Sequence, residues 1–248
     1  MSNDILPKSI SAVMTAHNEG AMAGVSFNNM IQCCEYARNH GISVETLVVL
    51  DRPSNATRKV FETLDQSQLI ETDFGDQGKV RNFAANHCQG DFIAFLDGDD
   101  LWSENWLSEA YNLLNSESEL AIAHPEFNWF FQGVSSVIAN IDQEDPNFAM
   151  DFLRHGNYWD AMCMAPRQTH LDQPYCERRV TDGFAFEDWH WNCETVTSGY
   201  KHKVVENTIH FKRRRPNSQT HEASGNQCLM PETKLTDFEW ISHAELIE

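Results

Sequence analysis

The sequence predicts an α/β fold in which a mostly parallel sheet is flanked by helices. Short apolar runs at residues 10–14, 46–50 and 92–96 have the length of buried strands. Segments between them repeat their apolar residues at helical spacing. This alternation favours a parallel sheet covered on both faces, whose ligands bind at the carboxyl ends of the strands.

The elements of the first half follow each other in a regular order. The dipeptide Leu69-Ile70 is a weaker strand signal than the three apolar runs, and it precedes a polar loop. We therefore expect strands at 10–14, 46–50, 69–70 and 92–96, and helices at about 27–37, 60–64, 78–87 and 106–114.

The second half is less regular and richer in aromatic residues. Its patterns at 120–124, 135–141 and 203–211 fit strands, and a helix is expected from Phe186 to a stop at Gly199. The chain has no internal repeat, low-complexity tract or clear linker. We therefore expect one domain over residues 1–248 with two functional halves.

Composition excludes several classes of protein. A formal net charge of −19 argues against a nucleic-acid binder, which would show a basic face. No apolar run approaches the roughly 18 residues of a membrane span, and residues 1–10 do not resemble a secretory signal. The seven cysteines form no C-x-x-C pair, which fits reduced thiols and predicts a cytoplasmic protein. The composition does not exclude contact of this protein with a membrane surface.

An acidic run, Asp97-Gly98-Asp99-Asp100, closes the most confident strand. Carboxylates this close repel one another unless positive charge lies among them. A hard divalent cation, Mn²⁺ or Mg²⁺, takes oxygen ligands and leaves places for substrate phosphates. An Asp-Gly turn or a helix cap before residue 106 is the alternative interpretation. The segment 15–19 and Asp51 should lie on the same rim of the sheet.

A basic run, Lys212-Arg213-Arg214-Arg215, gathers four of only 18 basic residues. Such a cluster in an acidic chain is typical of an anion-binding site. The alternative is a solvated turn between two elements. With residues 217–219 the run could also form a mobile clamp on a substrate.

The stretch from Gly78 to Asp100 resembles the family 2 glycosyltransferases, in which an alanine- and asparagine-bearing helix leads into a strand that ends in an Asp-x-Asp motif. The segment 15–19 resembles the first nucleotide-binding loop of that family, and Asp51 matches the aspartate after its second strand. Residues 184–188 resemble its Glu-Asp motif. The sequence departs from the family pattern after Asp51, where Arg52-Pro53-Ser54 follows, and in the first loop, which lacks a proline and an aromatic residue.

The resemblance implies an A-type glycosyltransferase fold and inversion at the sugar carbon. It divides the chain into a nucleotide-sugar-binding half at about 8–115, an acceptor half at about 116–215 and a C-terminal segment at 216–248. Asp51 would meet the base, expected to be uracil. The residues implied in binding the nucleotide diphosphate sugar are Thr15, Ala16, Asn18, Glu19, Asp51, Lys79, Arg81, Asp97, Gly98, Arg213 and Arg215.

The resemblance, together with the chemistry that sugar transfer requires, implies the remaining roles. A divalent metal on the diphosphate would stabilise the leaving group, with Asp97, Asp99 and His210 as implied ligands. Asp188 would be the general base for a hydroxyl of a saccharide or other acceptor, with Glu187 in reserve. We expect residues 125–179 to recognise the acceptor.

Two other functions compete with glycosyl transfer. A sugar-phosphate nucleotidyltransferase also needs a metal on a similar sheet, but it usually has a glycine-rich basic loop, and residues 15–20 hold one glycine and no Lys or Arg. A non-catalytic nucleotide-sugar-binding protein would keep the fold without turnover. Dinucleotide and P-loop enzymes are disfavoured because neither of their glycine motifs is present.

Overall fold

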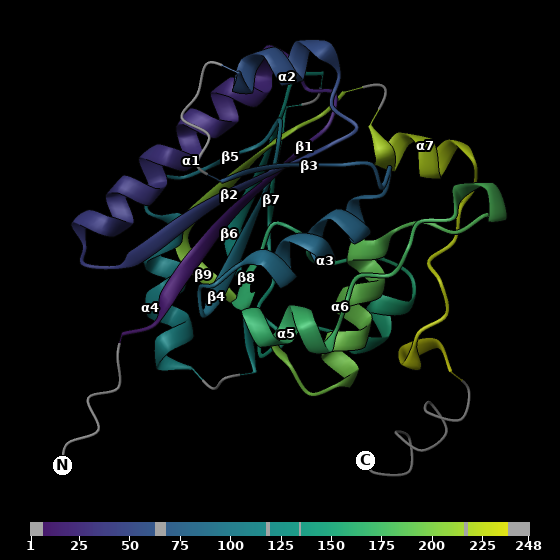
Figure 1. The fold of residues 1–248 in the computed structure, drawn as a ribbon. Coiled ribbons are helices and arrows are strands. Elements are labelled where there is room, and N and C mark those ends of the chain that lie inside the picture. Colours follow the sequence, from purple (N-terminus) through teal and green to yellow (C-terminus); the bar gives the residue numbers. More distant parts are fainter. Residues whose placement is uncertain (1–6, 63–67, 118–119, 134, 216–217, 238–248) are drawn as a thin grey trace.

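The structure is a computed structural model that describes residues 7–62, 68–117, 120–133, 135–215 and 218–237. Its strands form one mixed sheet in the order β3-β2-β1-β4-β8-β6-β9-β5, with β7 paired to β6 (Figure 1). The strands are β1 (Ser9–Ala16), β2 (Ser43–Asp51), β3 (Leu69–Thr72), β4 (Phe92–Asp97), β5 (Leu101–Trp102), β6 (Ala121–Phe131), β7 (Ser136–Ala139), β8 (Met164–Pro166) and β9 (Lys201–Arg213).

The direction of the strands divides the sheet into two parts. The strands β3, β2, β1 and β4 are all parallel, as the alternation of strands and helices predicts. Beyond β4 the sheet is mixed: β8 runs antiparallel to β4 and β6, whereas β9 runs parallel to β6. The α/β fold class is therefore confirmed, and the less regular second half still belongs to the same sheet.

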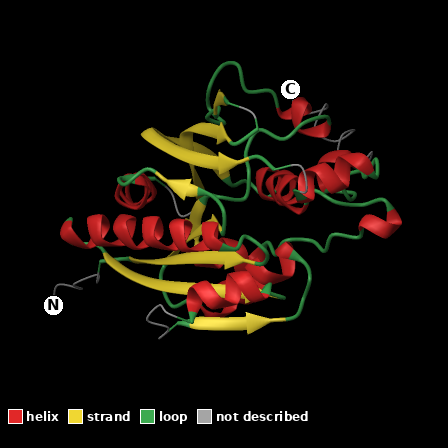
Figure 2. Ribbon diagram, turned by 90° about the horizontal axis from the view of Figure 1, so that it is seen from above, coloured by secondary structure: helices red, strands yellow, loops and turns green. Residues whose placement is uncertain are grey.

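Helices cover both faces of the sheet (Figure 2). One face packs against α1, α2 and α4, and the other packs against α3, α5 and α6. The α-helices are α1 (Ala21–Asn39), α2 (Asn55–Phe61), α3 (Gln77–His87), α4 (Trp106–Ser116), α5 (Arg167–Asp172), α6 (Glu187–Thr197) and α7 (Gln219–Gly225). Three short 3₁₀ turns are η1 (Met150–Arg154), η2 (Val180–Asp182) and η3 (Lys234–Thr236).

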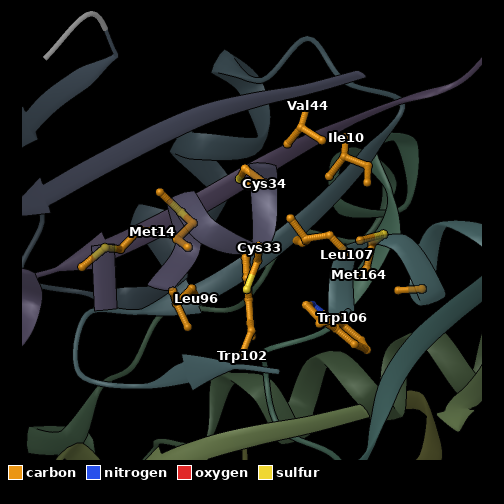
Figure 3. Packing of buried hydrophobic residues seen from close by; sticks show 14 of the residues in the cluster. Ile10, Met14, Cys33, Cys34, Val44, Leu96, Trp102, Trp106, Leu107 and Met164 are labelled. Atoms are coloured by element: carbon orange, nitrogen blue, oxygen red, sulfur yellow. The ribbon is translucent and has the colours of Figure 1, made fainter. Parts of the chain in front are cut away.

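The alternation of side chains along β1 shows how the two cores form. Ile10 and Met14 point to the side of α1 and α4, whereas Val13 points to the side of α3. Figure 3 shows the first core, where Trp102 and Trp106 pack beneath the helices. Fully buried aromatic side chains contribute roughly 2–3 kcal/mol each, so this layer fixes the rim of the sheet firmly.

Helix starts follow local rules of sequence. The side chain of Asp76 accepts a hydrogen bond from the Lys79 amide at 2.7 Å and caps α3. Ser54 caps α2 through the Thr57 amide at 3.2 Å. Both caps lie at the carboxyl edge of the parallel strands, and they hold the loops that form the site.

The expected elements are present, but several of their ends differ. The strand expected at 120–124 extends to Phe131, and the helix expected at 27–37 begins at Ala21. The helix expected at 60–64 is found at Asn55–Phe61, and positions 63–64 lie outside the described residues. The strand expected at 203–211 extends from Lys201 to Arg213, because its last residues pair with β6 up to Phe131. The sequence did not predict the two short strands β5 and β8, which have too few residues to show a period. Residues 218–237 of the expected C-terminal segment form α7 and η3, and its remaining residues lie outside the described ranges.

Candidate active site

The acidic run lies where β4 ends and turns toward β5. Gly98 is required there, because a Cβ at this position would lie 2.8 Å from the Ala16 Cβ and 3.0 Å from the Thr15 carbonyl oxygen. The turn therefore packs directly on the end of β1, and this contact brings the first polar loop to the acidic run. Ala16 and Gly98, both expected at the nucleotide site, meet in the structure.

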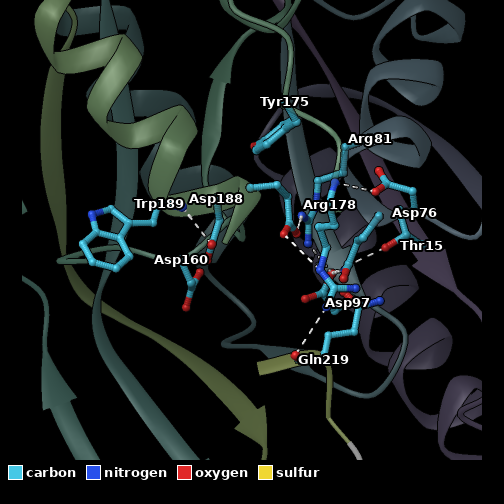
Figure 4. A network of polar contacts seen from close by, with 12 residues as sticks. Thr15, Asp76, Arg81, Asp97, Asp160, Tyr175, Arg178, Asp188, Trp189 and Gln219 are labelled. Carbon is cyan, nitrogen blue, oxygen red and sulfur yellow. Dashed lines mark hydrogen bonds and ion pairs between the residues drawn. The ribbon is translucent and has the colours of Figure 1, made fainter. Parts of the chain in front are cut away.

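Asp97 accepts three hydrogen bonds on its Oδ1 atom. The donors are Arg81 Nη2 at 3.0 Å, Gln77 Nε2 at 2.6 Å and the Thr15 hydroxyl at 3.4 Å. Figure 4 shows this network around Arg81 and Asp97. Three of the expected site residues are thus in contact, and Gln77 joins them although no sequence motif marks it.

The basic run lies against the acidic run. Arg215 Nε is 3.1 Å and Arg213 Nη1 is 3.9 Å from Asp99 Oδ2. Lys212 Nζ is 3.4 Å from Asp100 Oδ2, and the Arg213 amide donates to Asp100 Oδ1 at 2.6 Å. Three cations therefore offset the repulsion that the sequence predicted among the carboxylates. Lys212 and Arg213 belong to β9, so they do not form a solvated turn.

Burial changes the protonation of these acids. It raises the pKa of Asp99 to about 6, against the opposing effect of Arg215. Burial likewise raises the pKa of Asp100 to about 7, against the opposing effect of Lys212. The electrostatic cost of desolvating a carboxylate thus exceeds the attraction of each cation, and a further positive charge would be favourable here.

Other residues of the rim have different surroundings. Glu19 contacts Arg215 Nη2 at 3.3 Å, which joins the first loop to the basic run. Asn18 is exposed. Lys79 pairs with Glu177 at the surface and does not contact the acidic run.

Asp51 ends β2, as expected, and both of its carboxylate oxygens are used locally. Oδ1 accepts from the Thr72 hydroxyl at 3.0 Å and the Phe74 amide at 2.7 Å, and Oδ2 accepts from the Gly75 amide at 2.8 Å. Gly75 has a φ of +65°, which favours glycine. Asp51 therefore shapes the loop before α3 from beneath.

Arg81 connects the acidic run to the Glu-Asp pair at the start of α6. Its guanidinium is buried, with Nη1 3.0 Å from Glu187 Oε1 and Nη2 3.0 Å from Asp97 Oδ1. Burial opposes its charge, but Asp97 and Glu187 keep the pKa of Arg81 above its usual value. Arg178, which the sequence did not single out, lies 3.8 Å from Glu187 Oε2 on the other side.

Asp188 follows Glu187 at the start of α6, beside the ion pairs of Arg81. Burial and the neighbouring Glu187 raise its pKa to about 7, while Arg81 opposes the shift. Its Oδ1 accepts from the Trp189 amide at 2.8 Å. Phe186, the residue before α6, has a φ of +68°, a strained value for an aromatic residue that occurs most often at functional sites.

A cavity of about 410 Å³ joins these groups. One end is formed by Gln77, Arg81 and Asp97, and Glu187 and Asp188 follow. Figure 4 shows Asp160 and Trp189 near Asp188. The remaining lining residues are Asn128, Phe130, Ile138, Asn140, Asn157, Tyr158, Trp159, Asp160, Ala161, Arg178, Phe186, Trp189, Lys212, Arg214, Gln219, Thr220 and Ala223.

His210 lies apart from the acidic run. Its fully buried ring packs edge-on against Trp106 with centroids 4.5 Å apart, and burial lowers its pKa to about 3. In the described part of the chain, no three His, Cys, Asp or Glu side chains are grouped as a metal site. The expectation that His210 completes a metal shell thus finds no support in its packing.

Two carboxylate oxygens still suit a divalent cation. Asp97 Oδ2 and Asp99 Oδ1 accept no hydrogen bond from the described residues. Mg²⁺ commonly binds through one or two carboxylates plus substrate phosphates. These two oxygens are therefore suitable ligands for a metal ion that also binds a substrate diphosphate.

The fold is that of known sugar transferases. S. aureus TarS residues 1–349 in complex with UDP-GlcNAc superimposes with a TM-score of 0.65 at 15% identity, covering 87% of this chain and 61% of that one. The mannosyltransferase PcManGT from Pyrobaculum calidifontis, in complex with GDP-Man and Mn²⁺, has a TM-score of 0.58 at 15% identity, covering 84% and 57%. The chain thus has the A-type glycosyltransferase fold.

The chain belongs to glycosyl transferase family 2, whose model matches residues 11–163. It is also 26% identical over 121 residues to EpsH of Bacillus subtilis (strain 168), a protein with a provisional glycosyltransferase assignment; the match covers 46% of this chain and 35% of EpsH. The chain spans less than two thirds of each of these relatives. In the described residues, no helix is long and apolar enough to cross a membrane.

Proposed function

We propose that this chain is an inverting glycosyltransferase that moves a sugar from a nucleotide diphosphate sugar, UDP-linked, to an acceptor hydroxyl. One observation supports this most strongly. A carboxyl group whose pKa is raised to about 7, that of Asp188, lines the same cavity as Asp97, and Arg81 joins Asp97 to the adjacent Glu187. The ion pairs of Arg81 therefore connect the acid proposed to bind the nucleotide with the start of α6, where the proposed base lies.

The donor would lie on the rim made by the first loop, Asp97 and Asp99. Mn²⁺ or Mg²⁺, held by Asp97 and Asp99, would supply Lewis-acid stabilisation of the diphosphate. Arg213 and Arg215 contact Asp99 and could turn their donors to phosphate oxygens. Asp51 would support the base-binding loop indirectly, through the backbone amides that it orders.

Transfer would then follow from the position of Asp188. The acceptor oxygen forms a bond to the sugar carbon, while the bond from that carbon to the diphosphate breaks. The acceptor proton passes to Asp188, whose raised pKa makes it an effective base near neutral pH. Attack from the side opposite the diphosphate inverts the carbon. Glu187 is held by Arg81 and Arg178, so we assign it a positioning role.

A thermal-shift panel tests donor binding. We expect UDP to stabilise the protein in the presence of Mn²⁺ and to have little effect without it. Indifference to every nucleoside diphosphate would contradict the proposal.

The Asp188→Asn variant tests the proposed base. It should keep its affinity for UDP while its transfer rate falls by about 10²–10⁴-fold. A variant that transfers sugar at the wild-type rate would exclude Asp188 as the base.

A further inference from the structure

The cavity continues past Asp188 to a wall made by three strands. Asn128 and Phe130 come from β6, and Ile138 comes from β7. Asn140 follows β7, and Arg214 follows β9. We call these five residues the hairpin wall. Among the described residues, no hydrogen bond or ion pair joins these five residues to the acidic run, and none of them is assigned to the donor.

Arg214 differs from its neighbours in the basic run. Lys212, Arg213 and Arg215 each pair with a carboxylate of the rim or the cavity. Arg214 has no ion pair within the described ranges, and its exposed guanidinium lies 4.2 Å from the centre of the Phe130 ring. Within the described ranges, Arg214 is therefore the one member of the basic run without an ion-pair partner.

The Phe130 ring orients this cation toward a ligand. Phe130 is itself 6% exposed, so it is a fixed platform for the guanidinium. An arginine stacked in this way keeps its planar set of donors free and loses little side-chain entropy on binding an oxyanion. The geometry therefore suits a phosphate or carboxylate group that enters the cavity.

Asn128 supplies the second feature of the wall. Its side chain is 6% exposed, and Oδ1 has no hydrogen-bond partner in the described structure. Its Nδ2 donates only to Asn140 Oδ1, at 3.3 Å. A buried carbonyl oxygen without a donor is destabilising, because it has lost its hydrogen bonds to water. A ligand hydroxyl directed at Asn128 would remove this cost.

We propose that the hairpin wall binds the acceptor, and that the acceptor carries an oxyanion near the hydroxyl that receives the sugar. Arg214 binds the oxyanion, Asn128 accepts from a neighbouring hydroxyl, and Asp188 takes the proton of the reacting one. This inference rests on the proposed transfer reaction. It assigns the acceptor rather than the donor to Arg214, because Arg213 and Arg215 are the two arginines that reach Asp99.

Matched probes test the charge of the acceptor. Glycerol 3-phosphate is compared with glycerol, and methyl glucoside 6-phosphate with methyl glucoside, in the presence of UDP and Mn²⁺. We expect each anionic probe to bind at least about ten-fold more tightly, as one charge-assisted hydrogen-bonded pair predicts. Equal binding of the two members of each pair overturns the inference.

Variants test the assignment to Arg214. Arg214→Gln should abolish the preference for the anionic probe while changing the Kd for UDP less than two-fold, and Arg214→Lys should keep part of it. Lys201→Gln removes the same charge from the exposed far end of β9 and should leave all these constants unchanged. Loss of UDP affinity in Arg214→Gln, with the anionic preference intact, would assign Arg214 to the donor and overturn the inference.

A further measurement tests the proposed function independently of the acceptor inference. Hydrolysis of a UDP-sugar by the wild-type protein, measured without acceptor, reports donor use alone. If the wild type hydrolyses UDP-sugars and shows no anionic preference, the acceptor inference is wrong and the transfer reaction stands. If it neither binds nor hydrolyses any nucleotide sugar, the proposed function is wrong.

Discussion

Replacing Arg81 with Met removes a charge that joins the acidic run to α6. Arg81 and Glu187 are 2% and 9% exposed, so the substitution leaves a buried carboxylate with its nearest remaining cation, Arg178, 3.8 Å away. Breaking a buried ion pair by removing one partner costs about 3–5 kcal/mol. Asp97 is 24% exposed and keeps the hydrogen bonds from Gln77 and Thr15. We therefore expect a loss near the lower end, about 3 kcal/mol.

Urea unfolding at pH 7.5 measures this loss as a lower midpoint at unchanged slope. Arg179→Met is the matched control, because the Arg179 ion pair with Asp182 is half exposed at 3.8 Å and should contribute less than about 1 kcal/mol. Equal losses in the two variants would refute the role of Arg81 in joining the acidic run to α6.

Four further predictions concern single residues of the site. Because burial and Glu187 raise the pKa of Asp188 to about 7, the transfer rate should rise with pH to a plateau above about 8. Because the pKa of Asp188 is raised on folding, its ionisation lowers the stability of the folded protein above pH 7 and has no effect below about pH 4. Asp188→Asn should therefore be more stable than the wild type at pH 8 and equally stable at pH 4. A stability difference that does not depend on pH in unfolding curves would contradict this. Gly98→Ala should lower the free energy of unfolding by about 1–3 kcal/mol, because the added Cβ would meet Ala16 and Thr15. Gly225→Ala, where the added Cβ has open space, should leave the stability unchanged. Equal melting temperatures of the two variants would contradict the close packing at Gly98. Asp99→Ala should bind UDP equally with and without Mn²⁺ in calorimetry, and retention of the metal effect would remove Asp99 from the metal site.

The periodicity of the sequence predicted the parallel part of the fold well. The runs that became β1, β2 and β4 are mostly apolar because both faces of these strands are largely buried. Strand ends of a parallel sheet share one edge, so the meeting of Thr15, Asp51 and Asp97 at the rim could be expected before the structure was known. The Asp-x-Asp and Glu-Asp motifs supplied the rest of the expected site.

The contact between the basic and acidic runs could not be predicted from local sequence. Lys212 and Asp100 are brought together because β9 inserts between β6 and β5, and no residue period encodes that order. Asp160 and Asn128 line the cavity from segments without a motif. The sequence also could not predict on which side of β9 the His210 ring lies, because strand alternation does not show which face packs on Trp106.

The central claim is that a nucleotide diphosphate sugar binds between the acidic run and Asp188. A crystal structure with UDP and Mn²⁺, with the anomalous signal of manganese measured, tests it most directly. We predict one manganese peak that contacts Asp99 and the diphosphate, with UDP on the rim formed by Thr15 and Asp97. UDP bound elsewhere on the molecule, with no peak at the acidic run, would contradict it.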